Sequence, residues 1–308
     1  MHTNNVLRVF YKAETHYAGG DGGAAYSHTH ATATAGYTSF PFLAGIVNLG
    51  GKKWKRNRLK CPGLGLGKGQ MLSNKPEYKD LVIEYYIQGA DPFLLLLDDG
   101  TEGSKPASYT LNMVIPDATE AGTAKTFTAF GAELKSYECV GETSGDNPPT
   151  VKITFDVEDV IEDAGPTDFA AVAIPVTAVQ EWEDFIVTLD GDAILELKSF
   201  NFKIDNILTE AGSGYNGSFG KFQPIYKDRI LELDVGLYKD AAAIMYDKYT
   251  QAINSFTSIF NNGLQTVTIT NCYVDDDNGL DNDGKEVKEM EYKITVKNGD
   301  STITAATT

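Results

Sequence analysis

Histidines are the first residues to test for chemistry, because imidazoles so often serve as catalytic bases and metal ligands. The chain has four, and all lie at or before residue 30: His2, His16, His28 and His30. A Ser-His-Asp or Cys-His site would therefore take its base from an N-terminal segment made largely of Gly, Ala and Thr. Neither G-x-S-x-G nor H-E-x-x-H occurs in the sequence. We predict that the chain is not an enzyme.

Two places have residues that ligate metals. His28 and His30 have the spacing to chelate an ion from one strand face, but no cysteine or fixed carboxylate accompanies them. The better candidates lie in the acidic segment 275–284, and they are Asp275, Asp277, Asp281 and Asp283. Either register of a calcium-binding loop loses essential oxygens, because Met290 or Lys285 falls at its twelfth position. We interpret 275–284 as a solvated hairpin loop, with a weak surface calcium site as the alternative, and expect no cofactor.

The glycine-rich stretch PGLGLGKGQ (62–70) suggests a phosphate-binding loop but matches neither template. Pro62 stands where the Walker pattern needs Gly, and Gly69 stands where it needs Ser or Thr. We predict a turn-rich loop here. The cysteines, Cys61, Cys139 and Cys272, lie far apart and form no C-x-x-C pair, which excludes a zinc knuckle.

Charge is the strongest compositional signal. With 43 acidic and 26 basic side chains the net charge is −17, so the surface repels phosphate and specific nucleic-acid binding is not expected. One basic island opposes this trend, and its members are Lys52, Lys53, Lys55, Arg56, Arg58 and Lys60. Three interpretations apply to it: a solvated or edge-protecting strand face, a contact with an acidic surface of another copy, and a nucleic-acid contact. We treat the island as a candidate inter-subunit contact.

The organising pattern of the chain is an internal repeat. Tyr-Lys-Asp occurs at 78–80 and again at 226–228, each time at the start of a strand pattern. Each copy continues through an apolar or Ala-rich segment to a strand with one cysteine, and then to a strand carrying Lys-Ile-Thr, at 152–154 and 293–295. Because a repeated unit sets the whole architecture, we predict one β-rich unit written twice. The first unit covers residues 1–160 and the second covers 161–308.

The elements follow from this frame. Strands are predicted over 6–11, 78–88, 109–115, 127–140 and 151–157, with a strand, Asp-Gly turn and strand over 184–206. A short helix is predicted in the Ala-rich segment of the second unit, and the apolar run 90–100 is a helical turn or a strand. Residues 13–39 contain almost no large aliphatic side chain and are predicted to form a long loop, ordered only if something docks on it. The acidic, Gly- and Pro-containing stretch 158–168 marks the junction between the units.

Membrane insertion and export are not expected. No run of 18 apolar residues exists, so we predict no membrane-spanning helix. The apolar patch near the N-terminus is too short for a signal peptide. We expect the chain to fold in a cytoplasm.

The second half of the chain resembles a known family. The run LKSFNFKIDNILTEAGSGYNGSFGKFQPIYKDRILELDVGLYKDAAAIMYDKY followed by LQTVTITNCYV resembles the tail tube (major tail) proteins of tailed viruses. Glu14-Thr15-His16-Tyr17 resembles the opening motif of such proteins. The likeness is good over about 195–296 and weaker over 43–157, and the loop at 18–39 and the segment near 100–124 depart from it.

This resemblance implies a mainly β fold: tandem β-sandwich or partial-barrel units, each with one short helix. It implies a structural virion protein whose units join into rings, so that two units per chain give trimeric rings with pseudo-sixfold symmetry. Stacked rings would form a hollow conduit for viral DNA, which passes without specific binding. The implied partners are further copies of the chain, a tape measure protein, a tail terminator and baseplate or tip proteins. The implied location is the virion tail, assembled in the host cytoplasm.

The alternative is a tandem β-sandwich module for carbohydrate binding or adhesion. Such modules share the richness in Gly, Thr and Tyr, and they present exposed aromatic rings on one sheet face. Only two tryptophans, Trp54 and Trp182, are present to serve this role.

Overall fold

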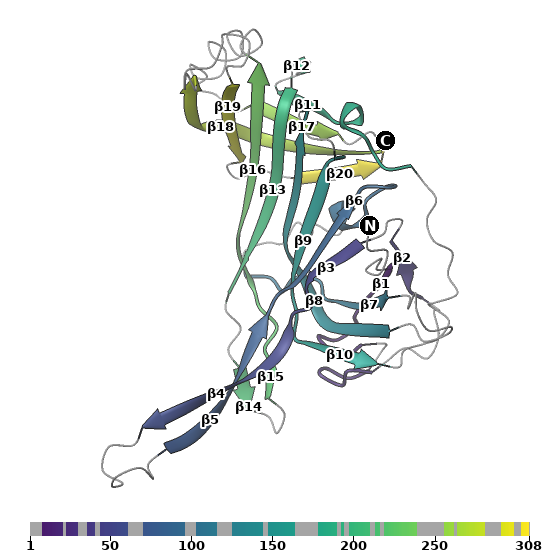
Figure 1. Cartoon of the computed structure of the whole chain (residues 1–308), viewed down its shortest axis with the longest axis vertical. Coiled ribbons are helices and arrows are strands. Elements are labelled where there is room, and N and C mark those ends of the chain that lie inside the picture. Colours follow the sequence, from purple (N-terminus) through teal and green to yellow (C-terminus); the bar gives the residue numbers. More distant parts are fainter. Residues whose placement is uncertain are drawn as a thin grey trace.

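A computed structural model describes residues 8–20, 23–29, 36–40, 44–60, 70–95, 103–115, 125–143, 147–163, 178–189, 192–193, 197–209, 213–215, 219–238, 256–261, 264–280, 291–298 and 303–307. Antiparallel strands dominate these residues, and one 16-stranded sheet joins most of them (Figure 1). The prediction of a mainly β fold is confirmed. No helix in the described ranges has the length and apolar character needed to cross a bilayer.

Ten strands belong to the first part of the chain. They are β1 (Arg8–Ala13), β2 (Thr38–Ser39), β3 (Ala44–Asn48), β4 (Gly51–Lys60), β5 (Gln70–Lys79), β6 (Leu81–Tyr86), β7 (Tyr109–Ile115), β8 (Lys125–Glu142), β9 (Thr150–Asp156) and β10 (Asp159–Asp163). The ten of the second part are β11 (Ile186–Leu189), β12 (Asp192–Ala193), β13 (Leu197–Leu208), β14 (Ser213–Tyr215), β15 (Phe219–Lys221), β16 (Tyr226–Tyr238), β17 (Phe256–Asn261), β18 (Gln265–Leu280), β19 (Glu291–Asn298) and β20 (Ile303–Thr307).

The second set of strands repeats the pairing pattern of the first. In the first set β1 pairs with β2 and β7, β3 with β6, β4 with β5, β6 with β9, and β8 with β7, β9 and β10. In the second set β11 pairs with β12 and β17, β13 with β16, β14 with β15, β16 with β19, and β18 with β17, β19 and β20. Among the described strands, one pairing has no counterpart, and it is the one that connects the two sets, between β8 and β13.

Several strands fall where none was predicted from the sequence. Strand β5 begins at Gln70, the last residue of the predicted loop 62–70, and runs to Lys79; it pairs with β4 as a long hairpin that projects from the body of the molecule (Figure 1). The matching segment of the second unit forms the short hairpin β14–β15. The predicted junction contains β10, which pairs with β8, so the first set of strands extends to Asp163. In each case backbone pairing with a neighbouring strand outweighs the local turn signals of Gly, Pro and Asp.

One core runs through both sets of strands. Its fully buried rings include Phe93 and Phe155 from the first set and Phe202 from the second. The single-turn helix α1 (Pro92–Leu95) falls in the apolar run where a helical turn or strand was predicted. Asp91 caps it by accepting a hydrogen bond from Phe93 N at 2.9 Å, and proline is well suited to the first helical position. The Ala-rich helix predicted for the second unit lies outside the described residues.

The N-terminal segment docks on the chain's own sheet. Its apolar contact is small: Tyr17 and Ala18 are buried against Phe130 of β8. Glu14 adds polar contacts, because its carboxylate accepts hydrogen bonds from Ala18 N, from Gly131 N and from a threonine hydroxyl of β7. The prediction that this loop needs a docking surface holds, and the surface belongs to the same chain.

Candidate assembly interface

The connection between β8 and β13 joins the two repeated sets of strands into one sheet. Residues 136–142 of β8 run antiparallel to residues 199–205 of β13, with Ser136 opposite Asp205 and Glu142 opposite Ser199. Figure 1 shows both strands as long neighbouring arrows through the middle of the molecule. We call this pairing the β8–β13 joint.

The inner face of the joint is apolar and closed to water. Tyr137 lies opposite Ile204 and Cys139 opposite Phe202, and all four side chains are buried. The rings of Tyr137 and Phe202 meet edge to face with centroids 6.2 Å apart. Burial, followed by the charge of Asp91, raises the pKa of the Cys139 thiol well above its usual value. The thiol therefore acts as a small apolar group.

A buried carboxylate fixes this inner face. Asp91 is fully buried, and its Oδ2 accepts hydrogen bonds from the hydroxyls of Tyr85 at 2.7 Å and Tyr137 at 3.0 Å. The pKa of each tyrosine is raised well above its usual value, first by burial and then by the charge of Asp91. Both phenols therefore stay protonated and donate to the carboxylate. A buried charge is tolerated only with such partners.

Asp91 also links the two sets of strands directly. Gln265, the first residue of β18, accepts a hydrogen bond from Asp91 N through its side-chain oxygen and donates its amide to Asp91 O at 2.8 Å. Its side chain is fully buried. One side chain thus pairs with both backbone groups of a residue 174 positions away in sequence. These two hydrogen bonds hold the turn at α1 against the start of β18.

The outer face of the joint carries a row of alternating charges. The row crosses five neighbouring strands, each residue directly opposite the next: Glu84, Lys152, Glu138, Lys203 and Glu232. Opposite charges at facing positions stabilise a strand pair by about 0.2–1 kcal/mol. Lys203 also forms an ion pair with Asp205 at 2.6 Å. That hydrogen bond is the largest cause of the raised pKa of Lys203, with Glu138 and Glu232 adding to it.

The six residues of the basic island all lie on β4, in one arm of the projecting hairpin. Lys52 is opposite Tyr78 and Lys60 is opposite Gln70, which places the island along the whole length of the arm. The island therefore lies on a strand, while its exposure to solvent and its contact partner stay predictions. Asp275 and Asp277, predicted in a hairpin loop, lie instead within β18, which extends to Leu280. Asp281 and Asp283 lie outside the described residues.

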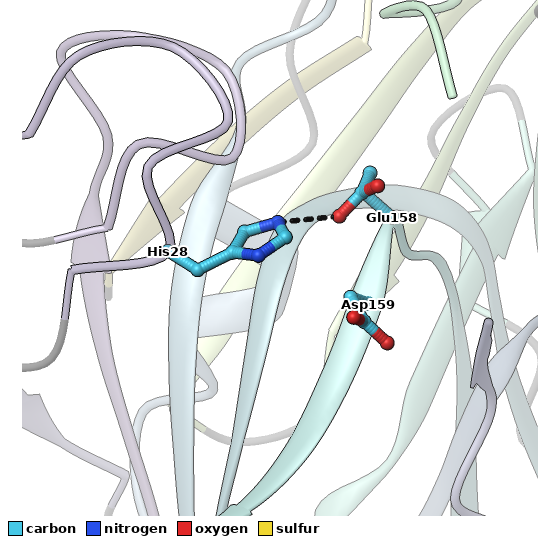
Figure 2. A group of neighbouring side chains, drawn as sticks. All are labelled: His28, Glu158 and Asp159. Carbon is cyan, nitrogen blue, oxygen red and sulfur yellow. Dashed lines mark hydrogen bonds and ion pairs between the residues drawn. The ribbon is translucent and has the colours of Figure 1, made fainter. Parts of the chain in front are cut away.

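A second polar cluster holds the N-terminal loop in place. His28 Nε2 lies 2.6 Å from Glu158 Oε2, and Asp159 lies beside the pair, as Figure 2 shows. The imidazole also packs against the ring of Phe130, with centroids 5.0 Å apart. His28 was considered from the sequence only with His30, which lies outside the described residues. Glu158 and Asp159 were read as part of a junction, and nothing in their spacing pointed to a histidine 130 residues away.

The electrostatics of this cluster favour a charged histidine. Burial lowers the pKa of His28, but its hydrogen bond to Glu158 and the charges of Glu158 and Asp159 outweigh burial, so the pKa is raised above 6.5. The three residues have ligand atoms within 4.8 Å of one another, as a metal site requires. However, Glu158 already pairs with His28, and Asp159 accepts a hydrogen bond from Val160 N at 2.9 Å. The cluster of His28, Glu158 and Asp159 therefore holds the N-terminal loop against the sheet, and we call it the His28 latch.

Comparisons with known proteins find likeness among solved structures and none among family profiles or curated proteins. No protein-family profile matches the chain, and no curated protein matches it. Among solved structures it is similar to a chain of the anti-feeding prophage (AFP) baseplate, determined by cryo-EM and 6-fold symmetrised. The likeness covers 54% of this chain and 97% of that chain, with 10% sequence identity and a TM-score of 0.36.

Proposed function

We propose that this chain is a structural virion protein, a tail tube subunit whose repeated units assemble into stacked rings around a DNA conduit, and that it has no catalytic role. One observation carries the proposal: two units with the same strand topology are joined edge to edge by the β8–β13 joint. Because the chain already places two like units side by side in one sheet, further copies can be added in the same way until a ring closes.

The number of copies follows from symmetry. Applying the same lateral operation again adds further units, and closed cyclic assemblies are the usual outcome for soluble homo-oligomers. The resemblance of residues 195–296 to tail tube proteins favours six units in a ring. Three copies of a two-unit chain supply them, which gives a trimer with pseudo-sixfold symmetry.

We assign the outer face of the sheet to the lumen. Its described side chains are polar along the charge row, and acidic groups such as Asp205 and Asp234 flank that row. With a net charge of −17 on the chain, the assembly repels phosphate. Repulsion prevents sticking, so DNA can slide through without specific contacts.

The hairpins suit contacts between rings. Both β4–β5 and β14–β15 extend toward the same end of the molecule in Figure 1, and they follow equivalent strands, β3 and β13. In a ring they would therefore project on one side, three long arms alternating with three short ones. The basic island on β4 would then meet an acidic surface of the next ring. A tape measure protein, tail terminator and baseplate proteins are the further partners we propose.

The carbohydrate-binding alternative has less support. Trp182 stacks on Phe200, with ring centroids 5.4 Å apart and an interplanar angle of 23°, and is partly buried against the core. A ring packed in this way has little face left for a sugar.

Negative-stain electron microscopy of the concentrated protein, with size-exclusion chromatography alongside, tests the proposal. Uniform rings or hollow tubes are expected. A homogeneous monomer across the accessible concentration range, with specific glycan binding in a screen, would overturn it.

A further inference from the structure

Among the described strands, the edges of β3 and of β18 beyond Cys272 lack a second neighbour, and we propose that they are the two halves of one interface between copies. Strand β3 of one copy pairs antiparallel with the C-terminal part of β18 in the neighbouring copy, in the register of the β8–β13 joint. This inference rests on the proposed ring assembly and identifies the surfaces that close it.

The repeated pairing pattern shows which two edges correspond to the β8–β13 joint. The partner of β13 in the joint is β8, and the counterparts of these two strands are β3 and β18. Within the described residues, β13 has neighbours on both sides, β8 and β16, whereas β3 pairs with β6 alone. Likewise β8 has both β9 and β13 along its C-terminal part, whereas β18 beyond Cys272 pairs with β19 alone. The chain therefore contains one complete joint and the two separate halves of another.

The register is fixed by rows of facing residues. In the first unit the row reads Gly45, Glu84, Lys152 and Glu138 across β3, β6, β9 and β8. In the second unit it reads Lys203, Glu232, Lys297 and Tyr273 across β13, β16, β19 and β18. Glu84 and Glu232 stand at the same distance from their Tyr-Lys-Asp triplets, which confirms that the two rows correspond.

The correspondence predicts which residues meet. Lys203 is opposite Glu138 in the joint, so Gly45 of one copy should be opposite Tyr273 of the next. One position along, Ala44 should be opposite Val274, as Phe202 is opposite Cys139. Ala44 is buried on the inner side, which matches the buried position of Phe202.

The composition of β3 fits an edge meant to be covered. Natural edge strands are usually protected by lysines, prolines or short length, because an open edge recruits other strands. β3 reads Ala-Gly-Ile-Val-Asn, without charge or proline, and its protection is limited to a bulge after Ile46. Val47 is 57% exposed and Tyr86 on the next strand is 40% exposed. Both border a shallow pocket of about 360 Å³ that also includes Gly45 and Ile46. A second copy would cover this apolar edge.

Cysteine cross-linking tests the pairing. The variant G45C/Y273C is made in a background of C61S, C139A and C272A, so that no other thiol competes. Gly45 has room for a side chain, because an added Cβ would meet nothing closer than Glu84 O at 3.9 Å. The matched control is E84C/Y273C, which moves the first cysteine one strand inward. A facing pair brings two Cβ atoms within disulfide reach, and a position one strand further away does not.

Oxidation of assembled G45C/Y273C protein should convert the monomer band into a covalent trimer that grows no further, and the control should stay monomeric. Rings without cross-linking would overturn the edge assignment and leave the proposed function standing. An unlimited ladder of multimers would overturn ring closure. A second variant, V47D, should remove rings while leaving the urea unfolding midpoint unchanged, since Val47 is exposed in the single copy. Intact V47D rings would contradict the interface independently of disulfide geometry.

Discussion

Glu138 and Lys203 face each other across the β8–β13 joint, one from each repeated unit. Each also faces an opposite charge on its other side, Lys152 for Glu138 and Glu232 for Lys203. Because a slip of one residue would reverse the face of every side chain in the strand, this row and the buried face behind it specify the register together. The joint thus fixes how the two repeated units pair, and it is the template that we propose for the contact between copies.

Reversing one charge in the row should weaken the fold by a measurable amount. Lys203→Glu places like charges at two facing positions, and we expect a loss of about 1 kcal/mol in the free energy of urea unfolding. The double variant E138K/K203E restores opposite charges across the joint, but it puts a lysine opposite Lys152 and leaves a glutamate opposite Glu232, so we expect no recovery. Lys227→Glu, at an exposed lysine of β16, is the control and should have little effect. Equal losses for K203E and K227E would show that the row contributes nothing.

The hydroxyl of Tyr85 should contribute far more to the stability of the fold than the hydroxyl of Tyr86. Tyr85→Phe removes a buried hydrogen bond to Asp91 and leaves the carboxylate short of a donor, which costs about 1–3 kcal/mol. Tyr86→Phe is the matched control on the same strand, because Tyr86 is exposed. Chemical denaturation of both variants measures the difference. Indistinguishable midpoints would contradict the role assigned to Asp91.

The His28 latch should be strongest in acid. A histidine whose folded pKa is raised above 6.5 adds stability that is fully present below pH 6.5 and is lost as the pH rises through the folded pKa. The difference in unfolding free energy between the natural chain and His28→Gln should therefore be larger at pH 5.5 than at pH 8.5. His16→Gln, at an exposed histidine, is the control variant. A difference that grows with pH would refute the latch.

Glu133 should make the fold sensitive to alkaline conditions. Burial raises the pKa of this fully buried carboxyl from 4.5 to about 9, and Gln223 and Lys221 offset burial only in part. Its folded pKa is raised, so stability present below pH 4.5 is lost as the pH rises toward 9. Glu133→Gln should flatten this fall, with its advantage over the natural chain growing from pH 5 to pH 8. A constant difference over that range would mean that Glu133 is ionised in the folded state.

Charge reversal in the β4 arm should separate ring formation from ring stacking. Replacing Lys55, Arg56 and Arg58 by Glu removes the attraction between the basic arm and an acidic neighbouring ring. We expect single rings of unchanged mass where the natural chain forms tubes, seen by electron microscopy. Raised salt should act in the same direction on the natural chain. Tubes that form normally from the variant would remove the island from the stacking contact.

The strands with alternating patterns could be predicted from the sequence almost to the residue. Tyr109–Ile115 matches its predicted range, and β8 and β9 differ by one or two residues at their ends. The repeat was visible too, because the Tyr-Lys-Asp triplets fall at equivalent places. The Lys-Ile-Thr triplets lie on equivalent strands but shifted, since Lys152 corresponds in register to Lys297 and not to Lys293.

The contacts between distant segments could not be predicted. Local turn signals hid β5 and β10, whose pairing partners outweigh their weak strand propensity. Gln265 clamps Asp91, and His28 reaches Glu158, across separations that no local spacing encodes. The edges of β3 and of β18 beyond Cys272, which lack a second neighbour among the described strands, have no local signature in the sequence, because an edge is a property of the whole sheet.

The most direct test of the central claim is the mass and end-on symmetry of the assembled ring, from native mass spectrometry and cryo-EM class averages. The account predicts three chains and six lobes, with long and short hairpins alternating around the ring. A ring with any other number of chains, or an assembly in which β3 and β18 both stay uncovered, would contradict it.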